Sequence, residues 1–90
     1  MITIWKYPLA ATQENKFAVP AGAKLLCAQS QHDWPNAWFE VEDSNPKEER
    51  TLYMFGTGHK IDVPLDTIRY VDTLQIQGGQ LVFHVYEKIK

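Results

Sequence analysis

Residues 69–88, RYVDTLQIQGGQLVFHVYEK, form two runs in which apolar and polar side chains alternate, joined by a Gly-Gly pair. Alternation with a period of two is typical of β-strands, and paired glycines supply the positive φ angles that tight hairpin turns need. The stretch therefore predicts a hairpin of strands Arg69–Gln77 and Leu81–Lys88. In its second strand one face carries Leu81, Phe83 and Val85, and the other carries Val82, His84 and Tyr86.

Outside this hairpin the chain repeats the pattern of short β-branched and aromatic runs separated by Pro, Gly, Asn and Asp, which indicates strands and turns. The expected strands are Ile2–Tyr7, Lys16–Val19, Lys24–Gln31, Ala37–Glu42 and Arg50–Phe55. We expect Ala37–Glu42 to pair with Arg50–Phe55 across a polar hairpin loop, Asp43–Glu49, and to bury Ala37, Phe39 and Val41. A single helical turn is expected at Pro64–Thr67.

Six or seven short strands in 90 residues, joined by connections too short for crossover helices, predict an all-β fold. We expect one domain over residues 1–90, built as a small antiparallel β-sandwich or barrel with at most one helical turn. The apolar strands near both termini carry more hydrophobic surface than so thin a core can hold. This excess favours a homo-oligomer, or a ligand on one face of the sheet.

The charge and cysteine content argue against several partners and compartments. The chain has 9 basic and 11 acidic residues, a net charge of −2 and no cluster of Lys and Arg, so nucleic-acid binding is not expected. No apolar run approaches the roughly 18 residues of a membrane span, and the start shows no export signal, so we expect no membrane association. The single cysteine, Cys27, forms no internal disulfide, which favours the cytoplasm.

The strongest candidate for a binding site is the segment Gly56-Thr57-Gly58-His59-Lys60, which follows an expected strand. Backbone N–H groups in a glycine turn can form an anion nest, and the adjacent hydroxyl, imidazole and ammonium groups would add donors around a phosphate. A nucleotide would suit such a site. The alternative is a structural turn or bulge in which glycines supply positive φ, and the spacing of a P-loop is missing.

Two tryptophans and a further histidine complete the candidate ligand-binding residues. Trp34 lies in an expected polar loop and Trp5 in the first strand, where each offers a flat face for stacking a base, or packs against the core or a sheet edge. His84 is either an interface residue or a base that shares a pocket with His59. No pattern indicates a catalytic nucleophile, a metal site or a cofactor.

Three motifs connect the chain with a known family. They are Ile4-Trp5-Lys6-Tyr7, Gly56-Thr57-Gly58-His59 and Gly78-Gly79-Gln80-Leu81-Val82-Phe83-His84-Val85-Tyr86-Glu87. With these motifs the sequence resembles a family of short, uncharacterised bacteriophage and prophage proteins, over nearly its whole length. The resemblance implies no assigned activity or site. It does imply a phage accessory role, for which binding a host protein or sequestering a nucleotide messenger of antiviral defence would be expected.

These observations favour one function and leave two alternatives open. The leading hypothesis is a β domain in the host cytoplasm that binds and sequesters a phosphate-bearing small molecule, such as a nucleotide messenger, without cleaving it. The first alternative is a protein-interaction module that inhibits a host factor through an aromatic sheet face or an exposed edge strand. The second is a small hydrolase that uses His59 or His84 as its base.

Overall fold

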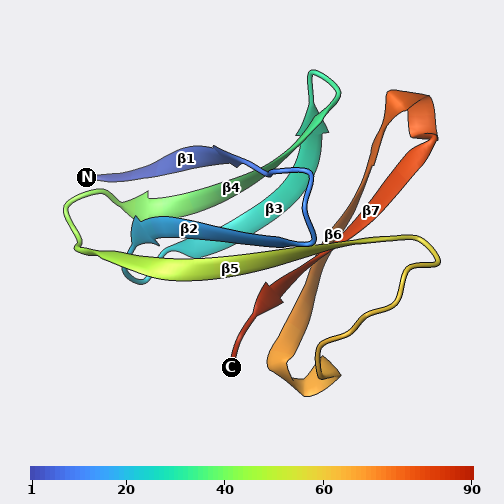
Figure 1. Cartoon of the computed structure of the whole chain (residues 1–90). Helices are drawn as coiled ribbons and strands as arrows, with labels where there is room; N and C mark the ends of the chain where they lie inside the picture. Colours follow the sequence, from blue (N-terminus) through green and yellow to red (C-terminus); the bar gives the residue numbers. More distant parts are fainter.

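The computed structural model describes residues 1–90 and contains seven strands in two antiparallel sheets (Figure 1). The strand order is β1-β4-β3 in the first sheet and β2-β5-β7-β6 in the second. The strands are β1 (Ile2–Pro8), β2 (Glu14–Pro20), β3 (Lys24–Gln31), β4 (Trp34–Glu42), β5 (Lys47–Gly56), β6 (Ile68–Ile76) and β7 (Leu81–Lys88). The predicted all-β fold is therefore confirmed. No helix in the molecule is long and apolar enough to span a membrane.

The predicted C-terminal hairpin is confirmed, because β6 and β7 pair along their length, from Ile68 opposite Lys88 to Ile76 opposite Leu81. Its connection is wider than a two-residue turn. Gln77 has a φ of 54°, ahead of the positive φ angles of Gly78 and Gly79, and these residues form a short 3₁₀ turn. The helical turn expected before β6 is also present, at Leu65–Thr67.

The predicted pairing of Ala37–Glu42 with Arg50–Phe55 is wrong. These residues belong to β4 and β5, which lie in different sheets: β4 pairs with β1 and β3, and β5 pairs with β2 and β7. The polar segment after Glu42 therefore crosses between the sheets (Figure 1). Alternation indicates which face of a strand is buried, and it contains no information about which strand lies beside it.

The core lies between the two sheets and comes from the inward face of each strand. Ala37, Phe39 and Val41 of β4 are fully buried, as predicted, and they pack against Leu52 and Met54 of β5. β5 is also buried on its opposite face, where Tyr53 and Phe55 form a second cluster. The residues that pack with these two rings are Ile61, Val63, Ile68 and Tyr86. The chain between β5 and β6 therefore covers part of the outer face of the second sheet.

Candidate functional site

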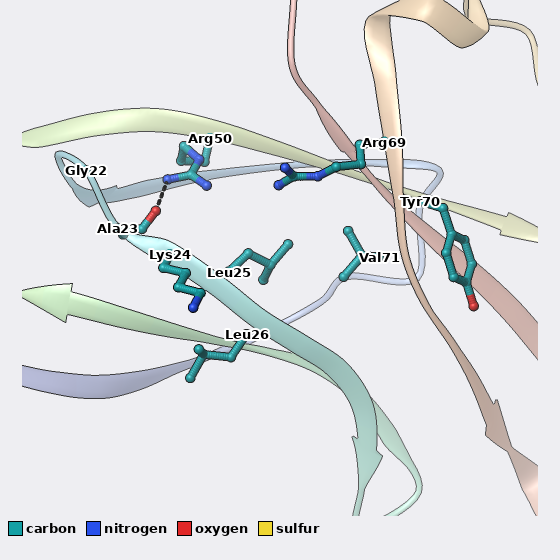
Figure 2. A pocket seen from close by; sticks show the side chains of 9 residues that line it. All are labelled: Gly22, Ala23, Lys24, Leu25, Leu26, Arg50, Arg69, Tyr70 and Val71. Atoms are coloured by element: carbon teal, nitrogen blue, oxygen red, sulfur yellow. Dashed lines mark hydrogen bonds between the residues drawn. The ribbon is translucent and has the colours of Figure 1, made fainter.

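The largest hollow in the molecule, about 510 Å³, lies between β3 of the first sheet and β6 of the second (Figure 2). Its volume is within the range of small-molecule sites, roughly 300–1,000 Å³. We call this hollow the β3–β6 cleft. The residues that line it are Gly22, Ala23, Lys24, Leu25, Leu26, Arg50, Arg69, Tyr70 and Val71.

The cleft forms where the edge strands β3 and β6, which are joined through Asp72, separate from one another. Below it, the Asp72 carboxylate of β6 accepts hydrogen bonds from the backbone N–H of Ala28 (3.3 Å) and the side-chain amide of Gln29 (2.8 Å), both on β3. We call these hydrogen bonds the Asp72 clasp. Next to it each strand has an irregularity, because the pairing register skips Leu26 in β3 and Val71 in β6. Such bulges bend a strand and redirect its side chains. Both skipped residues line the cleft.

A buried carboxylate holds two arginines at the base of the cleft. Glu87 follows Phe83 and Val85 on the inward face of β7, and only 2% of it is exposed. Arg50 donates to Glu87 Oε2 through Nε (2.8 Å) and Nη2, and Arg69 Nη2 donates to Oε1 (2.9 Å). A buried carboxylate needs such partners, since an unpaired charge in the interior is strongly destabilising.

The two arginines differ in how much of their donor capacity is used. Arg50 is 19% exposed, donates additionally through Nη1 to the carbonyl of Ala23 (2.7 Å), and lies over the Phe39 ring. Arg69 is 63% exposed and makes its only side-chain hydrogen bond through Nη2. Its Nε and Nη1 groups remain available to a ligand. In Figure 2 the Arg69 side chain extends from β6 toward Arg50, whose guanidinium is joined by a dashed line to the Ala23 carbonyl.

The residues that line the cleft include three cations and no carboxylate. Lys24 is exposed and makes no ion pair. Besides Glu87, Glu48 lies 3.8 Å from Arg50 Nη1 and accepts a hydrogen bond from the backbone of Gly22. Asp72 follows the lining residue Val71, and Glu40 lies opposite Lys24 in the pairing of β3 with β4. Two of the three cations that line the cleft, Lys24 and Arg69, are exposed.

The predicted glycine turn lies elsewhere, after the end of β5. Two of its amides are used within the fold: Thr57 N–H donates to the Val82 carbonyl (3.2 Å) and His59 N–H to the Gly56 carbonyl (3.0 Å). The amides of Gly58 and Lys60 make no backbone hydrogen bond. His59 and Lys60 are exposed. Two hollows of about 230 Å³ each adjoin the turn, and both are lined by Gly56, His59 and Phe83.

The structure brings Thr57 and His84 together. His84 Nε2 is 2.8 Å from Thr57 Oγ1, and its Nδ1 is 3.0 Å from Thr73 Oγ1, which in turn is 2.7 Å from the Tyr70 hydroxyl. This chain of hydrogen bonds links the glycine turn to β6 across the outer face of the second sheet. Neither histidine nitrogen contacts a carboxylate, and no group of three or more His, Cys, Asp or Glu side chains is arranged to hold a metal ion.

The two candidate tryptophans do not join the glycine turn. Trp34 begins β4 instead of lying in a loop, because His32 and Asp33, both with positive φ, make a tight turn after β3. Its indole N–H donates to the Leu9 carbonyl (2.9 Å), and 45% of the residue is exposed. Trp5 packs against the core with Lys47 over its ring. Lys47 begins β5 and Gly56 ends it, so Trp5 lies about 30 Å along the strand from the glycine turn.

Sequence reasoning missed Lys24, Arg50, Arg69 and Glu87. One signal was present in two of them: Glu87 continues the inward series of Phe83 and Val85, and Arg50 begins the series of Leu52 and Met54. A charged residue at an inward position needs a buried partner. That signal would have indicated an internal ion pair, although it would not have located the cleft above it.

Fold and cleft together define a small two-sheet β-sandwich with a cationic cleft between two of its sheet edges. The chain belongs to a family described as a domain of unknown function, DUF7352, whose model matches residues 1–90. No curated protein and no solved structure matches the chain.

Proposed function

We propose that this protein binds a small molecule carrying a phosphate or a similar anionic group, and that the anion lies in the β3–β6 cleft. The observation that carries the proposal is the exposed guanidinium of Arg69, which is held in place by Glu87 through one nitrogen and has free donors on the others. Exposed Lys24 of β3 also lines the hollow, and in Figure 2 its ammonium lies on the other side of β3 from Arg69. Arginine fixed in this way offers paired N–H donors that match the oxygens of a phosphate.

The cleft supports this function better than the glycine turn does. A nest needs successive backbone amides directed at one anion, and in the turn the amides of Thr57 and His59 already donate to carbonyls. The cleft is also more than twice as large as either hollow beside the turn. The glycine turn serves as the control site when binding is measured by calorimetry.

Binding without cleavage suits the residues that line the cleft. The lining includes no Ser, Thr, Cys or His side chain, and the Tyr70 ring points away from the hollow (Figure 2). The Glu87 carboxylate is engaged by both arginines, which leaves no group positioned as a nucleophile or general base. A nucleotide messenger that is held intact is therefore the first class of ligand to test.

Isothermal titration calorimetry with pyrophosphate, nucleoside monophosphates and cyclic dinucleotides tests the proposal. Because hydrogen bonds to charged groups contribute about 1.5–3 kcal/mol, Arg69→Gln should weaken binding by about 10- to 100-fold. Lys60→Gln removes the same kind of charge from the glycine turn and should leave the affinity unchanged. Absence of binding by every compound, or loss of binding in Lys60→Gln but not in Arg69→Gln protein, would refute the assignment.

A second candidate function, protein interaction, is favoured by the free edge of the first sheet. β1 pairs only with β4, and its outward residues Ile2 and Ile4 are 71% and 57% exposed. Unprotected edge strands with apolar side chains are common sites of association. Native mass spectrometry separates self-association from binding to another protein, and Ile4→Lys should abolish either assembly. A wild-type protein that is monomeric and captures no partner from a host lysate would eliminate this candidate.

A further inference from the structure

The β3–β6 cleft has two chemically different walls. The cationic wall consists of Arg50 and Arg69, whose guanidinium groups meet at Glu87, and Lys24 adds a further cation to the lining. The other side chains around the hollow are aliphatic. They are Ala23, Leu25, Leu26 and Val71.

The aliphatic wall is accessible and is directed into the cleft by the fold. Leu26 is 39% exposed, and Leu25 and Val71 are half-buried. Figure 2 shows Leu25 and Val71 extending into the space between β3 and β6, beside the two guanidinium groups. The irregularities at Leu26 and Val71 place both residues outside the regular pairing of their strands, where a bulge redirects side chains. Leu25 and Val71 pack against the core and also line the cleft.

Apart from the cationic donors of Lys24, Arg50 and Arg69, this lining offers no side chain that would recognise a hydroxyl group. It includes no Ser, Thr, Asn, Gln or Asp, and the Tyr70 hydroxyl is engaged with Thr73 on the other side of β6. Burying a ligand hydroxyl without a partner is unfavourable, whereas burying an apolar group against an aliphatic wall is favourable. An inorganic phosphate would occupy only a small part of the 510 Å³.

We infer that the ligand is an amphipathic anion: a phosphate or comparable group on Arg69, with an apolar or aromatic group against Leu25 and Val71. This inference rests on the proposed function, and it specifies the class of ligand that the same cleft accepts. The ring of a nucleobase or an aryl group fits this description, and a free phosphate or a sugar phosphate does not.

Titration calorimetry with four ligands of similar charge tests this inference: inorganic phosphate, ribose 5-phosphate, adenosine monophosphate and phenyl phosphate. Ribose 5-phosphate and adenosine monophosphate differ only in the base, which isolates the contribution of the ring. We expect at least one ring-bearing ester to bind about 10-fold more tightly than ribose 5-phosphate, because burying an aromatic group gains at least that factor.

Two variants assign the gain to the aliphatic wall. Val71→Thr keeps the shape of the side chain and the β-branching that strands favour, and Leu25→Thr makes the facing residue on β3 shorter and polar, so thermal melts should confirm that both fold. Each should reduce the advantage of the ring-bearing ester several-fold, while the affinity for inorganic phosphate stays unchanged. If neither ring-bearing ester exceeds ribose 5-phosphate, or if the advantage survives in both variants, this inference is wrong and the proposed anion site stands. If none of the four ligands binds, the proposed function itself fails.

Discussion

Replacing Glu87 by glutamine should strongly destabilise the fold, because this carboxylate accepts hydrogen bonds from two arginines at once. One carboxylate oxygen serves Arg50 and the other serves Arg69, and the side chain is only 3% exposed. Glutamine retains one acceptor and directs an N–H₂ group at one of the guanidinium groups. Arg69 is 63% exposed and can turn to solvent, whereas Arg50 is 19% exposed and cannot.

The expected loss of unfolding free energy is about 3 kcal/mol, the lower end of the range for breaking a buried ion pair, since one acceptor remains. For a domain of this size that corresponds to a fall in Tm of about 12–24 °C. Urea denaturation followed by tryptophan fluorescence measures it. Arg69→Gln is the matched control: it removes the exposed partner and should cost below about 1 kcal/mol. A Glu87→Gln protein within about 0.5 kcal/mol of wild type, or equal losses in the two variants, would refute this account of the cluster.

Three further predictions concern the clasp, the glycine turn and the cysteine. Asp72→Ala should cost about 2 kcal/mol and accelerate amide exchange along β3, because its carboxylate joins β3 to β6; unchanged exchange would contradict the clasp. Gly56→Ala would place a Cβ 2.9 Å from the His59 ring, so the histidine NMR signals should shift while stability falls by less than about 1 kcal/mol. Burial, and secondarily the charge of Asp72, raises the pKa of the Cys27 thiol. Its alkylation by iodoacetamide should therefore begin at higher pH in the folded protein than in the urea-unfolded chain, and coincident pH profiles would contradict this.

Much of the secondary structure could be predicted because it depends on neighbouring residues. Alternation along β4 correctly placed Phe39 inside, and the glycines after Gln77 correctly marked a hairpin. Trp34 was misplaced in a loop because the turn before it uses His32 and Asp33 at positive φ. Non-glycine residues adopt that conformation infrequently, so neither one signals a turn as plainly as glycine does.

Most of the candidate site could not be predicted from local sequence patterns. The glycine turn attracted attention because its residues are adjacent in sequence, whereas Arg50 lies 37 positions from Glu87 and 27 from the Ala23 carbonyl that it contacts. Inward alternation could show that both charges needed partners. It could not show that each was the partner of the other, or that Arg69 would complete the group.

The sequence alone determined where the chain extends, where it turns and which side chains avoid water, because backbone preferences and alternation act over a few residues. Only the tertiary structure decided that β4 and β5 lie in separate sheets. It also decided that the edge strands β3 and β6 meet at Asp72 and separate at the cleft. Those outcomes depend on how all seven strands share one core, and the energy of each pairing depends on partners distant in the chain. The cationic cleft is a product of that global packing.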